Sequence, residues 1–250
     1  MPREKVIEYL TPEEIRSRSG YLNERFKSYK GDASSMAGIC IIEKILKSKK
    51  LGKQSLKILD IGAGNGQFGF RLKDSGFLKI YGIDIDDYRP LEIKEGDTYL
   101  DFQLADLNLE KIPYGDNFFD LATSWCVLPH LENPHSLIRE VDRTIKPQGV
   151  WIFSMPNITS LNIRKKFLFK GDIDRFTETN NHISIFTPAL IKKTILKYFN
   201  LIEIDYIVDD GVYKGRLGWL KKIAINKKWF GQKKFKKWFG TNVIYIVSKY

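Results

Sequence analysis

The stretch LDIGAGNG, from Leu59 to Gly66, is the part of the sequence whose residue types point most directly to ligand binding. Gly62 and Gly64 follow an apolar run. A strand that ends in a glycine-rich turn before a helix lets a ligand approach backbone N–H donors closely. The dinucleotide fingerprint GxGxxG would require a third glycine where this sequence has Gln67. The spacing therefore predicts a nucleotide-like ligand and disfavours NAD.

Three aspartates that accompany successive apolar runs form a second group of candidate ligand-binding residues. Asp60 lies in the first run, Asp84 ends the run KIYGID, and Asp106 follows the third run. The carboxyl ends of parallel strands meet at one edge of a sheet, so these side chains are expected around one crevice. A carboxylate at Asp84 would accept hydrogen bonds from two ribose hydroxyls. The group suits a ligand with hydroxyl and amino donors and a positive centre better than a pyrophosphate.

Apolar runs that alternate with helical patterns supply the framework for these residues. Strands separated by helices predict an α/β fold, a doubly wound and mostly parallel seven-stranded sheet with helices on both faces. The helix QFGFRLKDSG is closed by Gly76, and PHSLIREVDRTIKPQG is expected to end at Pro147 and Gly149. SSMAGICIIEKILKSKK predicts an amphipathic helix. The expected strands are LKILDIG, LKIYGID, TYLDFQLA, FFDLATSW, GVWIFSMP, LIEIDYIV and NVIYIVSKY.

The 250 residues are expected to form one domain. We divide residues 1–250 into an N-terminal helical strap at 1–54, a ligand-binding core at 55–156, an insertion at 157–186 and a C-terminal part at 187–250. The C-terminal part contains a basic, aromatic insertion at 211–240. It begins with the helix TPALIKKTILKYF, for which Thr187 is the expected cap and Pro188 the first helical residue.

In this order, LDIGAGNG, YGIDID, FQLADL, FDLATSW and VDRTIKPQGVWIFSMPN resemble the successive motifs of class I S-adenosylmethionine-dependent methyltransferases. The resemblance runs from about Lys57 to Asn157 and, more weakly, through HISIFTPALIKKTI to the end. Each motif is weak individually, and their order and spacing make them specific together. The resemblance implies a Rossmann-like methyltransferase fold with S-adenosylmethionine as cofactor and S-adenosylhomocysteine as product.

The resemblance also implies roles for individual residues. The glycine turn would wrap the methionine end of the cofactor, with Asp60 orienting the turn and the amino group. Asp84 would bind both ribose hydroxyls, and Ile85 would lie against the adenine. Asp106 would accept from the adenine amino group beside Leu107, and a helix cap is the alternative for Asp106. No metal is expected. The complete expected cofactor-binding set is Asp60, Gly62, Ala63, Gly64, Gly66, Asp84, Ile85, Asp106, Leu107 and Ser124.

Two segments are expected to close over the ligand, because similar enzymes close their sites with the corresponding segments. One is the N-terminal strap, where Tyr21, Arg25 and Tyr29 are the candidate lid residues and a surface strap is the alternative interpretation. The other is the insertion at 157–186.

The three histidines are the candidate general bases, which are needed only if the acceptor is protonated at neutral pH. His130 falls just past the expected fourth strand, and a loop histidine bonded to backbone is its alternative. His182 belongs to the 157–186 insertion, with a structural role as its alternative. His135 starts a helix and is interpreted as a solvated first-turn residue. We therefore name His130 and His182 as the expected catalytic residues.

Positive charge is concentrated in one segment. The formal net charge is +11, and residues 211–240 contain ten lysines and arginines and no acidic residue. In KKFKKWFG, helical spacing would place Phe235, Trp238 and Phe239 on one side. This composition indicates peripheral contact with an anionic membrane surface. An RNA backbone with stacked bases, or a helix whose aromatics cover the sheet edge or a dimer partner, are the alternatives.

The rest of the sequence narrows the function. The fourth strand does not end in NPPY or DPPY and Cys126 does not follow a proline, which disfavours adenine, glutamine and cytosine C5 methylation. The absence of a signal segment and of a run of about 18 apolar residues predicts a cytoplasmic protein, with membrane contact only at the surface. We predict methyl transfer to a small-molecule or lipid- or sugar-linked acceptor at oxygen. RNA methylation, cofactor binding without catalysis and a nicotinamide-dependent oxidoreductase are the alternatives, and the oligomeric state is left open.

Overall fold

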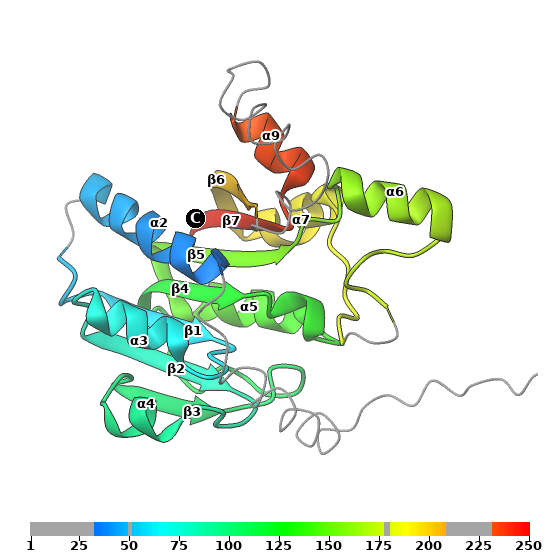
Figure 1. Cartoon of the computed structure of the whole chain (residues 1–250). Coiled ribbons are helices and arrows are strands. Elements are labelled where there is room, and N and C mark those ends of the chain that lie inside the picture. Colours follow the sequence, from blue (N-terminus) through cyan, green and yellow to red (C-terminus); the bar gives the residue numbers. More distant parts are fainter. Residues whose placement is uncertain (1–32, 50–51, 178–180, 209–231) are drawn as a thin grey trace, which may run out of the picture.

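A seven-stranded sheet forms the centre of the computed structural model, which describes residues 33–49, 52–177, 181–208 and 232–250. The strand order is β3-β2-β1-β4-β5-β7-β6 (Figure 1). Neighbouring strands from β3 to β5 are parallel, and β7 is antiparallel to both β5 and β6. The predicted α/β, mostly parallel sheet is therefore confirmed. The strands are β1 (Lys57–Ile61), β2 (Lys79–Asp84), β3 (Asp101–Leu104), β4 (Phe119–Trp125), β5 (Ile145–Pro156), β6 (Phe199–Ile207) and β7 (Asn242–Lys249).

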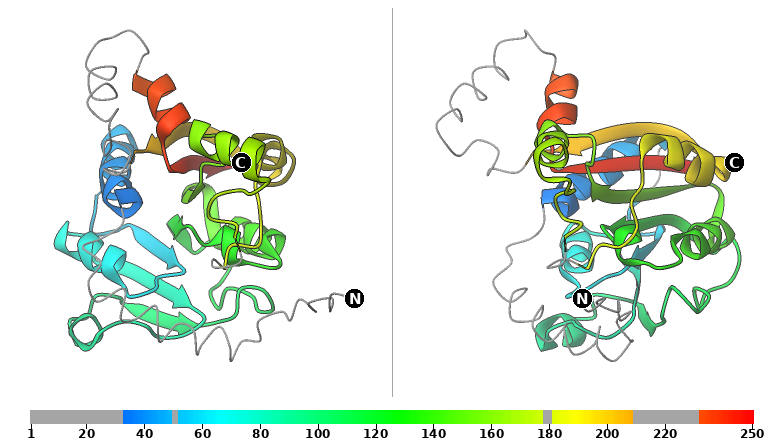
Figure 2. Two further views of the ribbon diagram at one scale, coloured as in Figure 1. Left: turned by 45° about the vertical axis from the view of Figure 1, so that its right-hand side comes forward. Right: turned by 90° about the vertical axis from the view of Figure 1, so that its right-hand side faces the viewer.

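Helices cover both faces of the sheet, as the two further views show (Figure 2). Buried side chains of α2 (Ala33–Lys49), α3 (Gln67–Asp74) and α4 (Leu91–Glu95) pack on one face. Those of α5 (Pro134–Thr144) and α7 (Pro188–Thr194) pack on the other. The remaining described helical segments are η1 (Leu128–His130), α6 (Leu161–Lys170), η2 (Ile195–Lys197) and α9 (Gln232–Phe239).

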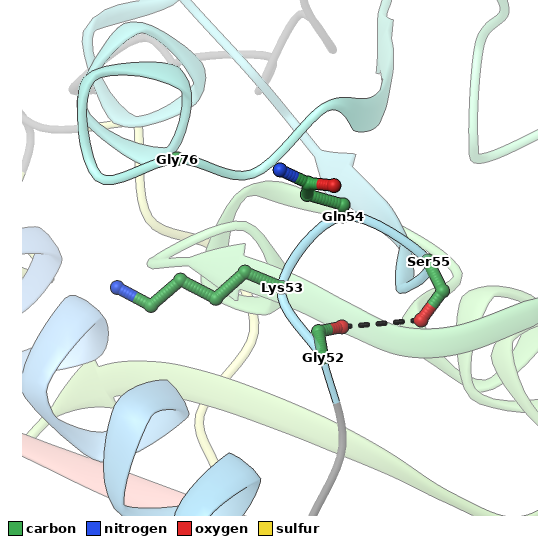
Figure 3. Close-up of a pocket in the computed structure, with 5 residues that line it drawn as sticks. All are labelled: Gly52, Lys53, Gln54, Ser55 and Gly76. Atoms are coloured by element: carbon green, nitrogen blue, oxygen red, sulfur yellow. Dashed lines mark hydrogen bonds between the residues drawn. The ribbon is translucent and has the colours of Figure 1, made fainter.

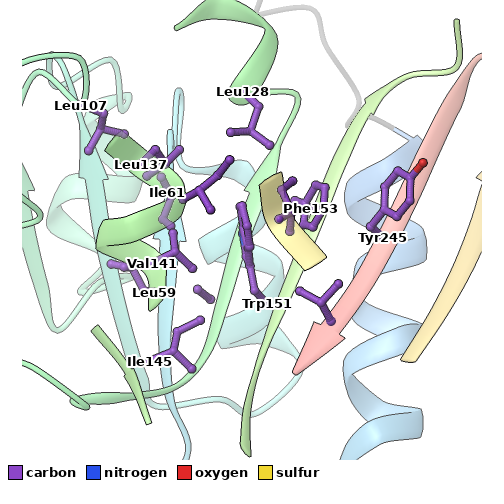
Figure 4. Packing of buried hydrophobic residues seen from close by; sticks show 14 of the residues in the cluster. Leu59, Ile61, Leu107, Leu128, Leu137, Val141, Ile145, Trp151, Phe153 and Tyr245 are labelled. Carbon is purple, nitrogen blue, oxygen red and sulfur yellow. The ribbon is translucent and has the colours of Figure 1, made fainter. Parts of the chain in front are cut away.

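Alternation along the central strands separates the two cores. In β1, Ile58 joins the core under α2 and α3, whereas Leu59 and Ile61 join the core under α5. The second core is built around Trp151 and Phe153 of β5, whose rings lie 4.3 Å apart and which Figure 4 shows together with Leu59 and Ile61. Burial on both faces explains why these strands read as continuous apolar runs.

Two predicted helix ends differ from the structure. The helix that begins at Pro134 was expected to reach Pro147, but α5 ends at Thr144 and β5 begins at the next residue. A residue before proline avoids the helical region, so Lys146 is extended, and Ile145 is buried opposite Phe119. The predicted helix from Thr187 is capped as expected, since the Thr187 side chain accepts from the N–H of Leu190, but α7 passes into the 3₁₀ segment η2.

Several predictions concern residues outside the described part of the chain. Tyr21, Arg25 and Tyr29 lie there, as does most of the basic insertion at 211–240. The last part of that insertion forms α9, where Phe235 is 3% exposed and Trp238 is 42% exposed. Among the described helices, none is both long and apolar enough to cross a lipid bilayer.

Arg143, near the end of α5, fixes the loop that joins β3 to β4. Its guanidinium donates to the carbonyl oxygens of Ile112 at 2.8 Å and Tyr114 at 2.9 Å. It also pairs with Glu140 at 2.6 Å and Asp116 at 2.7 Å. The loop lacks regular structure, so one side chain satisfies several of its backbone acceptors at once.

Replacing Arg143 with alanine should lower the free energy of unfolding by about 2 kcal/mol, because two carbonyls and two carboxylates lose a charged donor. Urea denaturation measures this change. Arg139→Ala is the matched control, since Arg139 is exposed on the same helix, and it should change stability by less than about 0.5 kcal/mol. Equal effects of the two substitutions would contradict the role given to Arg143.

Candidate functional site

The turn between β1 and α3 is built on glycines in the left-handed region. Gly62, Gly64 and Gly66 have φ values of 66°, 55° and 73°, which glycine adopts without the penalty of a Cβ. The N–H groups of Gly62 and Ala63 both donate to the carbonyl oxygen of Ile83, at 2.9 and 3.2 Å. The turn is therefore fixed to β2 by its backbone.

The glycines differ in what surrounds them. A Cβ at Gly62 would approach Val127 to 2.4 Å, and one at Gly66 would approach Ile93 to 2.9 Å. A Cβ at Gly64 would meet nothing within 4 Å. Ala63 is 9% exposed and packs in the core. Gly64 is thus the one of the three glycines whose backbone faces open space.

Asp84, at the end of β2, lies directly beside this turn. Its carboxylate accepts from the N–H of Gly64 at 2.7 Å and from the N–H of Ile85 at 2.7 Å. Burial raises the pKa of Asp84 to about 6, and these two N–H donors oppose the rise. The carboxylate is therefore mainly ionised at neutral pH. Each of its oxygens keeps a lone pair for a further donor.

Asp60 lies beneath the turn and is 1% exposed. Its carboxyl accepts from the Tyr99 hydroxyl at 2.8 Å and from the Thr123 hydroxyl at 3.2 Å. Burial raises its pKa to about 7, and the nearby charge of Asp84 adds to the rise. Asp60 thus connects β1, β4 and the segment before β3. Its predicted contact with the cofactor amino group stays a prediction.

The remaining predicted cofactor residues are dispersed. The Asp106 carboxyl accepts from the N–H of Asn108 at 2.9 Å within a turn, and no described helix begins there, so the helix cap named as its alternative is not what the structure shows. Leu107 is 7% exposed and belongs to the core under α5 (Figure 4). Ser124 is 1% exposed, and its hydroxyl accepts from the Trp151 indole N–H at 3.1 Å. The structure therefore places the Leu107 and Ser124 side chains in the core.

The chain turns back over the glycines immediately after β4. Cys126 has a φ of 55°, which costs a non-glycine residue about 1–2 kcal/mol. Its N–H bonds both the carbonyl and the hydroxyl oxygen of Ser154, at 3.2 and 3.1 Å. This anchored bend brings Val127 over Gly62, so the segment that carries His130 lies beside the glycine turn.

His130 and His182 meet although 51 residues separate their positions in the chain. Their rings lie 4.4 Å apart, edge to face, and His130 Nδ1 is 3.3 Å from the carbonyl oxygen of Asn181. The backbone N–H groups of Ile183 and Ser184 donate to the carbonyl of Pro129 at 2.7 and 3.0 Å. The 157–186 insertion is therefore fastened to the segment after β4.

The two imidazoles have lowered basicity. Desolvation by the surrounding protein lowers the pKa of His130, although part of the residue is exposed to solvent. Burial and the neighbouring His130 lower the pKa of His182 to about 4. Both rings are neutral at pH 7 and can accept a proton. His135 is exposed in the first turn of α5, as expected, and its ring centroid lies 6.4 Å from that of Phe186.

A separate hollow of about 620 Å³ lies at the opposite, amino-terminal end of β1 (Figure 3). It is lined by Gly52, Lys53, Gln54, Ser55 and Gly76. The Lys53 amine is already engaged by Glu43 and the Ser75 carbonyl. This hollow is lined by no acidic residue and by no turn like that at residues 62–66. We therefore place the candidate site at Gly64 and Asp84. Within the described residues, no group of three His, Cys, Asp or Glu side chains could hold a metal ion.

Sequence reasoning missed two residues at this edge. Tyr99 supplies the hydroxyl that satisfies buried Asp60. Arg89 pairs with Asp87 at 2.8 Å and lies 3.7 Å from the centre of the Phe102 ring. The Arg89 stem also packs close to Gly66. Neither residue belongs to a recognisable motif, so no local signal identified them.

Stability should depend on pH through Asp60. Its folded pKa of about 7 exceeds its ordinary value of 3.8, so the folded state binds the proton more tightly, and this contribution is lost as pH rises from about 4 through 7. Asp60→Asn removes it. The melting temperature of the variant minus that of the parent should therefore fall as pH is lowered from about 8 to 5. The exposed Asp97, replaced by Asn, is the control. A constant difference for Asp60→Asn would contradict the raised pKa.

Comparison with known proteins agrees with this geometry. A family model described as a methyltransferase domain matches residues 59–153, which include the glycine turn, Asp84 and the segment after β4. The ubiquinone biosynthesis O-methyltransferase of Yersinia enterocolitica is 30% identical over 108 residues, covering 40% of this chain and 43% of the relative. The chain spans about half or less of the length of this and other curated relatives.

Solved structures extend the similarity to nearly the whole chain. The [4+2]-cyclase SpnF is similar with a TM-score of 0.62 at 16% identity, covering 96% of this chain and 97% of SpnF. An S-adenosylmethionine-dependent methyltransferase from Archaeoglobus fulgidus is similar with a TM-score of 0.53 at 19% identity, covering 84% and 93%. At these identities the likeness concerns the fold alone, and a fold does not fix the reaction. The family match identifies residues 59–153 as a methyltransferase domain, and the solved structures share the fold of the chain.

Proposed function

We propose that this protein transfers a methyl group from S-adenosylmethionine to oxygen of a small-molecule or lipid-linked acceptor. The observation that carries the proposal is the turn at Gly64, which faces open space beside an ionised carboxylate at Asp84. A cofactor with two ribose hydroxyls and a positive sulfonium matches an acidic acceptor group next to exposed backbone. The family and the fold imply the same cofactor.

The cofactor, when bound, supplies a methyl group activated by its attachment to a positive sulfur. The protein's task is then to hold the acceptor in line with that methyl group and to exclude water, and good alignment contributes roughly 7–11 kcal/mol. The residues that we propose for this task lie on the segment after β4 and on the insertion. Val127 covers Gly62, and the insertion is fastened to Pro129.

A hydroxyl acceptor must lose its proton, and His130 is better suited than His182 to take it. A carbonyl oxygen only accepts hydrogen bonds, so the Nδ1–H of His130 donates to the carbonyl oxygen of Asn181. In this tautomer the Nε2 atom of His130 carries the lone pair that can accept a proton. His182 has a pKa of about 4 and a buried Nδ1 atom, which makes it a weak base at neutral pH. The relative from Yersinia enterocolitica bears the name O-methyltransferase, which supports oxygen as the acceptor atom.

Binding of S-adenosylmethionine tests the cofactor assignment. Calorimetry should detect binding of S-adenosylmethionine and none of NADH. Asp84→Asn should weaken binding by at least about tenfold, because a charged hydrogen bond contributes about 1.5–3 kcal/mol. Asp74→Asn is the control, since it removes the same charge from the exposed end of α3, and should leave affinity unchanged. Full affinity in Asp84→Asn, or preference for NADH, would refute the assignment.

Turnover of His130→Ala tests the proposed base. With the phenol or polyprenyl phenol that gives the highest release of S-adenosylhomocysteine, the variant should lose about 10²–10⁴-fold in kcat and keep its cofactor affinity. The parent rate should be level at neutral pH and decline only below about 6.5, because the pKa of His130 is lowered. His135→Ala, at an exposed position in α5, is the control. Unchanged turnover in His130→Ala would remove it from the reaction.

A further inference from the structure

Helix α6 exposes three of its five apolar side chains. Of its ten residues only Ile163 is buried, at 7% exposure. Phe167, Leu168 and Phe169 are 57%, 77% and 80% exposed. Three consecutive helical residues point in directions about 100° apart, so a single core cannot cover all of them. Three large apolar side chains exposed next to one another on a charged helix indicate an interaction site, whereas single scattered exposed apolar residues do not.

Helix α9 lies beside α6 and extends this surface (Figures 1 and 2). The Arg164 guanidinium of α6 lies 6.0 Å from the centre of the Trp238 ring of α9. The side-chain amide of Asn157, which is 2% exposed, donates to the carbonyls of Lys237 at 2.9 Å and Gly240 at 3.0 Å. Buried Phe235 anchors α9, while Trp238 faces outward. The two helices therefore form one surface.

The charges on this surface have one sign. The sequences LNIRKKFLFK of α6 and QKKFKKWF of α9 contain eight basic residues and no acidic residue. Lys166 pairs with Asp174 and Lys236 with Asp205. Among the described residues, the other six basic side chains have no carboxylate partner, and all six are exposed. Six exposed positive charges on α6 and α9 thus accompany the exposed apolar side chains of α6 and Trp238 of α9.

We propose that residues 164–170 and 233–238, the α6–α9 surface, dock the protein on an anionic lipid bilayer. Exposed phenylalanine and leucine side chains fit the boundary between headgroups and acyl chains, and tryptophan favours that boundary. The lysines and arginines fit anionic headgroups, each contributing attraction near the surface. RNA would use the charges and the aromatic rings but offers no apolar phase for Leu168. The bilayer is therefore the partner whose chemistry matches both the exposed apolar side chains and the positive charges of this surface.

The docking surface lies at the carboxyl ends of the parallel strands, where the glycine turn also lies. Helix α6 follows the carboxyl end of β5, and α9 precedes β7, which starts at Asn242 opposite Pro156 of β5. Parallel β1 and β5 end at the same edge. A docked bilayer would therefore lie on the acceptor side, where a lipid-linked acceptor can reach the site. This consequence rests on the proposed function, whereas the docking itself does not.

Co-sedimentation of the full chain with vesicles tests the docking. The protein should sediment with vesicles of phosphatidylcholine and phosphatidylserine, weakly with phosphatidylcholine alone, and less as salt is raised. The triple variant F167S/L168S/F169S should bind the anionic vesicles at least about tenfold more weakly, because the apolar insertion is lost. So should the variant in which four exposed lysines become glutamine, namely Lys165, Lys170, Lys233 and Lys234.

Matched controls change equal numbers of exposed apolar or basic residues elsewhere on the surface. The apolar control is L78S/L104S/L109S, whose leucines are 56%, 56% and 82% exposed, and the charge control is glutamine at exposed Lys79, Lys111, Lys192 and Lys193. Both should sediment like the parent. Undiminished binding in F167S/L168S/F169S, absence of vesicle binding, or retention of transfer RNA without vesicle binding would each overturn the proposal. Because no methyl transfer is measured, these outcomes are independent of the S-adenosylmethionine experiments.

Discussion

The site depends on the hydrogen bonds that join the glycine turn between β1 and α3 to the end of β2. Three contacts make this junction: two backbone N–H groups on the Ile83 carbonyl and the Gly64 N–H on the Asp84 carboxylate. They are short-range consequences of parallel pairing between β1 and β2, which places Ile61 beside Ile83. Once that register is set, the turn cannot move away from Asp84 without losing all three bonds. A preformed edge of this kind lets a ligand bind without first ordering the backbone.

Beneath the junction, the buried carboxyl of Asp60 acts as a structural support. A carboxyl group in the core is costly unless it is hydrogen-bonded. The hydroxyls of Thr123 in β4 and of Tyr99 just before β3 donate the hydrogen bonds that Asp60 needs. The nearby charge of Asp84 also makes Asp60 harder to ionise, since it contributes to the raised pKa of Asp60. The two aspartates at the strand ends therefore have different roles. Asp60 is buried and supports the structure, whereas Asp84 faces the glycine turn.

The part of the site that lies over the glycine turn is formed by segments that are distant in the sequence. Cys126 bends the segment after β4 over Gly62, and residues 181–184 of the insertion fasten to that segment. The same insertion carries α6, which Asn157 connects to the end of α9. A protein that acts on a lipid-linked acceptor gains from this connection, because the surface proposed to meet the bilayer and the segment proposed to hold the acceptor are continuous.

Local signals in the sequence were sufficient for the framework, for the glycine turn and for the acidic end of β2. Alternating apolar runs determined the seven strands, and the left-handed glycines and the acidic end of β2 follow from turn chemistry that involves only neighbouring residues. The burial of the Leu107 and Ser124 side chains was not determined in this way, because what covers a strand or the turn that follows it depends on helices elsewhere in the chain. The same holds for Tyr99 beneath Asp60 and for the meeting of His130 with His182. Tertiary structure alone decided these contacts, since only packing of the whole sheet brings such distant residues within hydrogen-bonding or van der Waals distance.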